Sequence, residues 1–81
     1  MQFIYTPTAQ EHFKRLPPEA RKRVAAKMRF YADQPDPLVF AERLADQASY
    51  RFRIGDYRVI FEVQNAVVWV LAIRRRDEAY R

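Results

Sequence analysis

The sequence predicts an α+β domain of two layers, in which a short N-terminal strand and a two-helix hairpin pack on a small antiparallel sheet. Three observations predict this class. Apolar residues recur at helical spacing in the first 33 residues, polar and apolar residues alternate from residue 50 to residue 63, and residues 66 to 73 are almost wholly apolar. Helical spacing exposes one apolar stripe and alternation exposes one apolar face, so each layer needs the other to bury it.

Residues 2 to 5 are expected to form the short strand, and the first helix is expected to follow it directly. Thr6 and Pro7 mark the start of that helix, because threonine is a favourable N-cap and proline suits the first helical position. Ala9, Phe13 and Leu16 then give the helix an apolar stripe.

A second helix is expected to open at the Pro17-Pro18 pair and to end near Asp33, since the prolines that follow cannot continue it. Its apolar face consists of Val24, Met28 and Tyr31. Residues 34 to 48 are expected to form a loop or a short irregular turn.

The last third of the chain predicts a three-stranded meander. Residues 50 to 54 alternate as a half-buried strand does, and Gly55-Asp56 is a two-residue hairpin signal. Residues 57 to 63 form the return strand, and the chain turns again at residues 64 and 65. The apolar run 66 to 73 is typical of a central strand covered on both sides, and a basic tail follows it.

Length and charge limit the class of protein. The chain has 81 residues, enough for a single domain over residues 1–81. Its net charge is +5 and its pI about 10.0, which favours a polyanion, nucleic acid first, over an acidic protein or a membrane surface. Twelve of the 15 basic residues are arginine, whose guanidinium group binds phosphate through two parallel hydrogen bonds. An arginine-rich, high-GC genome explains the same bias equally well.

The absence of certain sequence features predicts the cellular compartment of the protein. It contains no cysteine, so neither a disulfide nor a thiolate zinc site can form, and a reducing compartment fits. The first residues do not resemble a signal peptide, and the longest apolar run is too short to span a bilayer. We therefore expect a cytoplasmic protein without a membrane partner.

The hairpin signal predicts a face rich in arginine. With Gly55-Asp56 as the turn, Arg53 lies opposite Arg58, and Arg51 lies two residues from Arg53 on the same face. All three side chains are then expected to face solvent, with Phe52, Val59 and Phe61 buried under the helices. Two interpretations remain open: a cradle for a phosphate, and a solvated face that happens to be basic and that Glu62 partly neutralises.

The tail adds the run 74–76, all arginine, with Tyr80 four residues beyond it. This run is either part of the same site or a solvated terminus, and Tyr80 is either a reacting group or a hydrophobic anchor. The only histidine, His12, is expected to be structural or exposed. No metal-ligand cluster or glycine-rich phosphate loop is present, so any reaction must rely on charge stabilisation without a metal or cofactor.

Taken together, these segments resemble the RelE/ParE superfamily of bacterial toxins over nearly the whole chain. The most specific segment is YRFRIGDYRVIFEV at residues 50–63. Weaker matches are residues 3–9, 16–24 and 70–73 and the tail ending in Asp77-Glu78-Ala79-Tyr80-Arg81.

The resemblance implies roles for individual residues. RelE-like members cleave mRNA in the ribosomal A site, and their catalytic positions match Arg51, Arg53, Arg58, Arg76 and Tyr80 of this sequence. RNA or ribosome binding is then expected from Arg74, Arg75, Arg81, Lys22 and Lys27. The best-known RelE carries lysine where Arg51 and Arg53 stand. Arginine holds its proton too tightly to act as a general acid, so Arg53 is expected to stabilise charge only.

The resemblance also implies partners. A cognate antitoxin is expected, together with the ribosome and mRNA, and operator DNA through the antitoxin. ParE-like members instead inhibit DNA gyrase and have largely lost the nuclease residues, which is the main alternative. A third is an inactive protein with the toxin fold that only pairs with an antitoxin.

Overall fold

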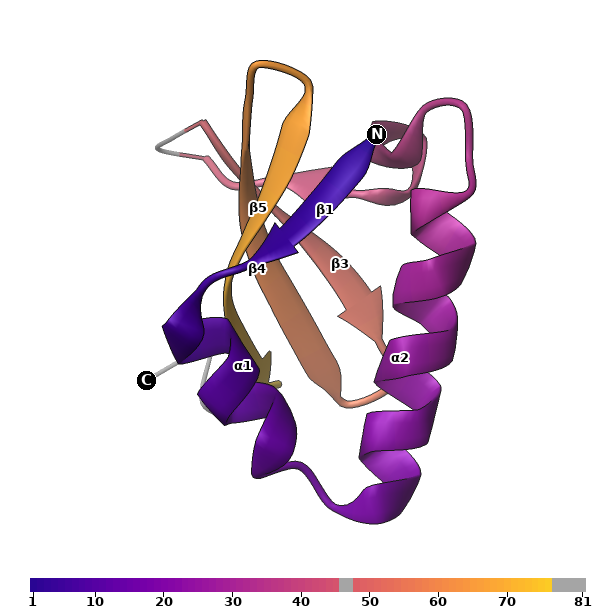
Figure 1. Cartoon of the computed structure of the whole chain (residues 1–81), viewed down its shortest axis with the longest axis vertical. Helices are drawn as coiled ribbons and strands as arrows, with labels where there is room; N and C mark the ends of the chain where they lie inside the picture. Colours follow the sequence, from indigo (N-terminus) through magenta and orange to yellow (C-terminus); the bar gives the residue numbers. More distant parts are fainter. Residues whose placement is uncertain (46–47, 77–81) are drawn as a thin grey trace.

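The computed structural model describes residues 1–45 and 48–76 (Figure 1). Five strands form one sheet in the order β1-β5-β4-β3-β2. The strands are β1 (Gln2–Tyr5), β2 (Glu42–Arg43), β3 (Ser49–Ile54), β4 (Tyr57–Gln64) and β5 (Val67–Arg75). The other elements in the described residues are two α-helices, α1 (Pro7–Lys14) and α2 (Pro18–Ala32), and a short 3₁₀ helix, η1 (Pro37–Phe40).

The predicted starts of both helices and the predicted end of α2 are confirmed. The first helix is shorter than expected: α1 ends at Lys14, so Leu16 lies beyond it. The Thr6 hydroxyl accepts the Ala9 N–H at 3.2 Å, and Pro7 is the first residue of α1. Pro18 opens α2, which ends at Ala32, one residue before the expected position. Proline restricts both boundaries because it fits the first turn of a helix and cannot continue its interior.

The helices cover one face of the sheet, with α2 beside β3 and α1 against β5 (Figure 1). The predicted helix residues Val24, Met28 and Tyr31 are buried there, together with Phe52, Val59 and Phe61 of the sheet. Aromatic rings form the centre of this core: Tyr31 stacks on Phe52 at 4.1 Å and Phe52 on Phe61 at 4.5 Å between centroids. The two-layer α+β class is confirmed.

The sheet is mixed, whereas the sequence predicted an antiparallel one. β1 pairs in parallel with β5, with Tyr5 opposite Val70, while the other neighbours are antiparallel. A pairing between segments more than 60 residues apart leaves no local pattern in the sequence, whereas a hairpin does.

The segment from residue 34 to residue 48 holds more structure than the expected loop. The Asp36 carboxylate accepts the Leu38 N–H at 3.1 Å and caps η1. The strand β2 then adds an edge to the sheet by pairing with β3. A strand of two residues has no periodicity that sequence reasoning can detect.

The two hairpin turns differ. The Gly55-Asp56 turn is confirmed, and Gly55 has a φ of +58°, which glycine adopts without strain. The second turn lies at Asn65 and Ala66, one residue later than predicted, with φ values of +52° and +61°. Positive φ at both central residues matches a type I′ hairpin turn.

The prediction that the last strand is covered on both sides is wrong. β5 does lie inside the sheet, between β1 and β4. Its residues Val68, Val70 and Ile73 are buried under the helices, while Trp69 on the opposite face is only half-buried. Helices cover a single face, so burial along β5 alternates.

Candidate anion-binding site

Three arginines from three neighbouring strands stand in one row on the outer face of the sheet, away from the helices. Arg53 of β3 is opposite Arg58 of β4, as predicted, and Arg58 is opposite Arg74 of β5. Directly opposed residues have Cβ atoms about 4.5–5.5 Å apart, and like charges so placed repel. We call Arg53, Arg58 and Arg74 the arginine row, and an anion bound among them would reduce their mutual repulsion.

A β-bulge decides that Arg74 belongs to the row. The register of β4 on β5 shifts between Ile60 and Phe61, which leaves Leu71 without an opposite residue. Without that shift, the pairing set at the turn would place Ile73 opposite Arg58 and turn Arg74 to the helix face. The bulge thus directs Arg74 to the outer face.

The exposure of the three predicted hairpin arginines differs from the expectation. The Arg53 side chain is 52% exposed, as predicted, and that of Arg51 is 24% exposed. The prediction for Arg58 is wrong, because this residue is only 2% exposed. Its strand, β4, is the central strand of the sheet, with β3 and β5 on either side. Arg53 and Arg74 are therefore the exposed members of the row, and Arg58 is its buried member.

An acidic residue from β2 contacts two of the arginines, and sequence reasoning missed it. Glu42 lies 3.4 Å from a terminal guanidinium nitrogen of Arg51 and 3.5 Å from Nε of Arg53. Exposed pairs of this kind contribute only about 0–1 kcal/mol. Glu62, which the sequence suggested for this neutralising role, instead accepts a hydrogen bond from Ser49 at 3.4 Å.

The three arginines of the run 74–76 lie in different places. Arg74 joins the row, whereas Arg75 is opposite Tyr57 and so belongs to the helix face. The Arg76 N–H donates to the Asp56 carbonyl at 2.7 Å, which ties the tail to the β3–β4 turn. Tyr80 and Arg81 lie outside the described residues.

The cations of α2 lie on the other side of the sheet from the arginine row. Lys22 is exposed, and the Lys27 ammonium sits 5.6 Å from the Phe30 ring centroid. Neither is brought to the row. Arg23 was not predicted, yet its guanidinium lies beside the hairpin turn: a Cβ added at Gly55 would stand 2.7 Å from one of its nitrogens. No sequence signal identifies such a contact, because it depends on how α2 packs.

His12 has a structural contact. Its Nδ1 accepts the Ile73 N–H at 3.1 Å, and the residue is half-buried between α1 and β5. This contact lies on the helix side, so the imidazole does not join the arginine row.

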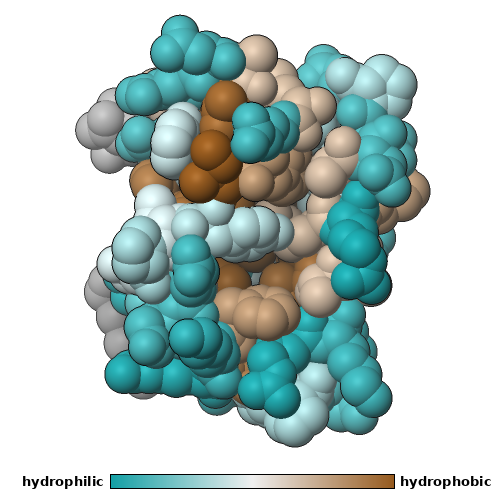
Figure 2. All heavy atoms as spheres, in the orientation of Figure 1, coloured by the Kyte–Doolittle hydropathy of each residue, from teal (hydrophilic) through white to brown (hydrophobic). Residues whose placement is uncertain are grey.

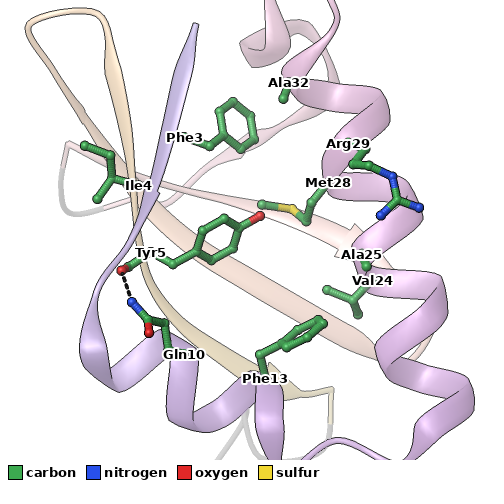
Figure 3. A pocket seen from close by; sticks show the side chains of 10 residues that line it. All are labelled: Phe3, Ile4, Tyr5, Gln10, Phe13, Val24, Ala25, Met28, Arg29 and Ala32. Atoms are coloured by element: carbon green, nitrogen blue, oxygen red, sulfur yellow. Dashed lines mark hydrogen bonds between the residues drawn. The ribbon is translucent and has the colours of Figure 1, made fainter.

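A groove of about 680 Å³ lies between α2 and the first strand and helix. Figure 2 shows it as a hollow with apolar atoms at its floor, and Figure 3 shows Phe3, Tyr5 and Phe13 pointing across it toward α2. Burial raises the pKa of the Tyr5 phenol above its ordinary value of 10.0. Met28 and Arg29 line the opposite wall. The groove suits the apolar side chains of a partner segment, and the sequence did not predict it.

Two further findings concern only residues 1–45 and 48–76. No group of three or more histidine, cysteine, aspartate or glutamate side chains is placed to hold a metal ion there. No helix in these ranges is long and apolar enough to cross a membrane.

Comparison with solved structures shows the same fold in several toxin complexes. The RelB-RelE antitoxin-toxin complex from Methanococcus jannaschii matches with a TM-score of 0.78 and 19% identity, over 95% of this chain and 94% of that chain. The RelE-RelB complex from Pyrococcus horikoshii matches with a TM-score of 0.74 and 24% identity, over 93% of this chain and 93% of that chain. The chromosomal ParDE system from P. aeruginosa matches with a TM-score of 0.71 and 14% identity, over 93% of this chain and 95% of that chain.

Sequence comparisons bear on the family. No curated protein matches the chain. Residues 3–80 match the family model described as the ParE toxin of the type II toxin-antitoxin system, parDE. Since this match spans nearly the whole sequence, the protein belongs to the ParE toxin family, within the RelE/ParE superfamily of type II toxin–antitoxin toxins.

Proposed function

We propose that this toxin is a ribosome-dependent mRNA endoribonuclease whose arginine row stabilises the transition state of phosphoryl transfer. The observation that carries the proposal is the register that aligns Arg53, Arg58 and Arg74 across three strands. Strand backbones hold these side chains at fixed spacing before substrate arrives. Preorganised donors of this kind are worth roughly 3–4 kcal/mol each where charge develops.

In the proposed reaction, the ribose 2′-oxygen bonds to the adjacent phosphorus and the bond from phosphorus to the 5′-oxygen breaks. The products are a 2′,3′-cyclic phosphate and a free 5′-hydroxyl. Negative charge grows on the nonbridging oxygens, where arginine donors neutralise it. Arg76, which the turn contact holds next to the hairpin, and Arg51 complete the cationic set.

Proton transfer needs a group other than arginine, because a guanidinium does not release its proton. Tyr80 is the proposed general base that takes the proton of the 2′-hydroxyl, since nearby arginines lower the pKa of a phenol. Water supplies the proton that the departing 5′-oxygen needs to become a hydroxyl. The ribosome supplies the remaining help by holding the mRNA in an in-line geometry. DNA lacks the 2′-hydroxyl and should not be cut. RNA and ribosome contacts are assigned to Arg74, Arg75, Arg81, Lys22 and Lys27.

The second candidate is inhibition of DNA gyrase without nuclease activity. Two observations favour it: the matching family model is that of ParE toxins, and Arg58 is covered. A binding protein needs the cationic surface of Arg53 and Arg74 but does not need Arg58 to contact a substrate.

A cognate antitoxin is the proposed partner under either activity. Operator DNA would be bound indirectly, through the antitoxin. The similar structures include toxin–antitoxin complexes. Two surfaces suit such a partner: the arginine row attracts acidic side chains, and the groove beside α2 accepts apolar ones. The proposed compartment is the cytoplasm, where ribosomes and gyrase both operate.

One experiment separates the candidates. The purified toxin is added to translating ribosomes and mRNA 5′ ends are mapped, while a parallel reaction follows supercoiling by gyrase. New 5′ ends with intact gyrase activity support the endoribonuclease. Unchanged mRNA with blocked supercoiling overturns it in favour of gyrase inhibition.

A further inference from the structure

The edge of β5 that faces away from β4 loses its neighbouring strand halfway along. β1 ends at Tyr5, opposite Val70, so residues beyond Val70 have no β1 partner. Ile73 is nonetheless a buried residue, with 6% of its surface exposed. A backbone N–H that is buried must find an acceptor within the protein.

Beyond the end of β1, two side chains hydrogen-bond this edge of β5, one at the bulge and one just after it. The Thr6 hydroxyl donates to the Leu71 carbonyl at 3.3 Å, on the residue that has no opposite partner in β4. Two residues later, His12 Nδ1 accepts the Ile73 N–H at 3.1 Å. The imidazole must be neutral, with its proton on Nε2, to accept at this atom.

Arg74 follows Ile73 directly, so the residue that His12 holds adjoins the arginine row. The direction of the Arg74 side chain depends on the shifted register, because a slip of one residue moves a side chain to the opposite face. We propose that His12 is a positioning residue of the anion site: its Nδ1 locks the bulged register of β5 and thereby keeps Arg74 in line with Arg58. The role of this site in RNA binding rests on the proposed function, whereas the register does not.

The chain offers closely matched variants. His12→Asn keeps an oxygen the same number of bonds from Cα as Nδ1, so it can still accept the Ile73 N–H. His12→Gln carries its oxygen one bond further, and His12→Ala has no acceptor. All three are neutral side chains.

The first measurement is NMR of the whole chain. In the wild type and His12→Asn we expect slow exchange of the Ile73 amide hydrogen and cross-strand contacts between Arg58 and Arg74. In His12→Ala and His12→Gln we expect fast exchange at Ile73 and loss or averaging of those contacts. If His12→Ala keeps both signals at wild-type strength, the proposal is overturned, and a variant too unstable to study is replaced by His12→Gln.

The second measurement is affinity for a short single-stranded RNA. We expect the affinity to weaken about tenfold in His12→Ala and His12→Gln and to return to the wild-type value in His12→Asn. A tenfold loss is smaller than the roughly hundredfold that misplacing groups by 1 Å can cost in catalysis. Equal affinity of all four proteins contradicts the positioning role. If wild-type toxin cuts no mRNA on ribosomes, the proposed function fails, while NMR and RNA binding still decide this proposal.

Discussion

Arg58 shows how one residue can satisfy a sequence pattern and still lie in an unexpected environment. Alternation placed it correctly opposite Arg53, but it is 2% exposed in the centre of the sheet. Removing an arginine from such a position changes the charge available to a substrate and also the packing of its neighbours. An activity measurement on this residue therefore needs a stability measurement beside it.

We expect Arg58→Ala and Arg76→Ala each to reduce ribosome-dependent mRNA cleavage by about a hundredfold or more, because each removes a charge-stabilising donor. The rate of appearance of new mRNA 5′ ends measures the effect. Arg15→Ala is the matched control, since this exposed arginine caps the end of α1 on the helix side. Cleavage that survives Arg58→Ala in a folded protein would remove the arginine row from the mechanism.

Tyr5 gives a second test on a single side chain. Burial raises the pKa of its phenol above 10.0, so the folded state favours the neutral form. The resulting contribution to stability is complete below pH 10 and is lost as the pH rises through the ordinary and then the raised pKa. We expect the free energy of unfolding of Tyr5→Phe to fall less steeply above pH 10 than that of the wild type.

Urea denaturation between pH 8 and pH 11 measures this difference. Tyr57→Phe, which removes a phenol hydroxyl at a half-buried position of β4, is the control and should follow the wild-type curve. Parallel curves for Tyr5→Phe and wild type would show that the buried phenol does not govern alkaline stability.

Among the elements, the two hairpins illustrate how turn chemistry sets register. Gly55 suits its positive φ, whereas Ala66 carries a side chain at a φ of +61°. A non-glycine residue in this region costs roughly 1–2 kcal/mol, and the preferred pair for a type I′ turn is Asn-Gly. The chain supplies the asparagine at position 65 and an unfavourable residue after it.

We therefore expect Ala66→Gly to stabilise the protein by about 1 kcal/mol, although the same change usually destabilises. Ala26→Gly is the control, because Ala26 is exposed inside α2, where glycine costs about 1 kcal/mol. Urea midpoints of the two variants should move in opposite directions. Destabilisation by both would mean that Ala66 is unstrained.

For the molecule as a whole, charge and an open groove lead to the expectation of a tight partner. The chain carries a net charge of +5, and its apolar groove has a volume of about 680 Å³. A domain near this size buries only about 60% of the surface that its unfolded chain exposes, so intrinsic stability is modest. A partner that binds only the folded state adds stability by mass action.

We expect the product of the adjacent gene to be a small acidic protein that binds with a Kd of about 1 nM or below. At a concentration a thousandfold above Kd, it should raise the free energy of unfolding by about 4 kcal/mol. Calorimetric titration and thermal unfolding of the complex measure both quantities. Free expression without slowed growth, and no binding by the neighbouring product, would contradict the antitoxin partnership.

The sequence by itself determined the features that depend on neighbours along the chain. Thr6 and Pro7 predicted the start of α1, and alternation about Gly55-Asp56 predicted that Arg53 faces Arg58. Segment 50–63 and the tail also suggested the superfamily to which the chain belongs. Caps, turns and alternation are local, so a single sequence contains all the information that they require.

Only the tertiary structure decided which distant residues meet. The parallel pairing of β1 with β5, the contact of Glu42 with two arginines and the burial of Arg58 all join segments that no local pattern connects. The face on which Arg74 lies depends on one unpaired residue, Leu71, because a shift of a single position reverses a strand's two faces. That shift lies where β1 ends and where Thr6 and His12 side chains hydrogen-bond the edge of β5 that no strand covers. This arrangement is a consequence of packing in three dimensions.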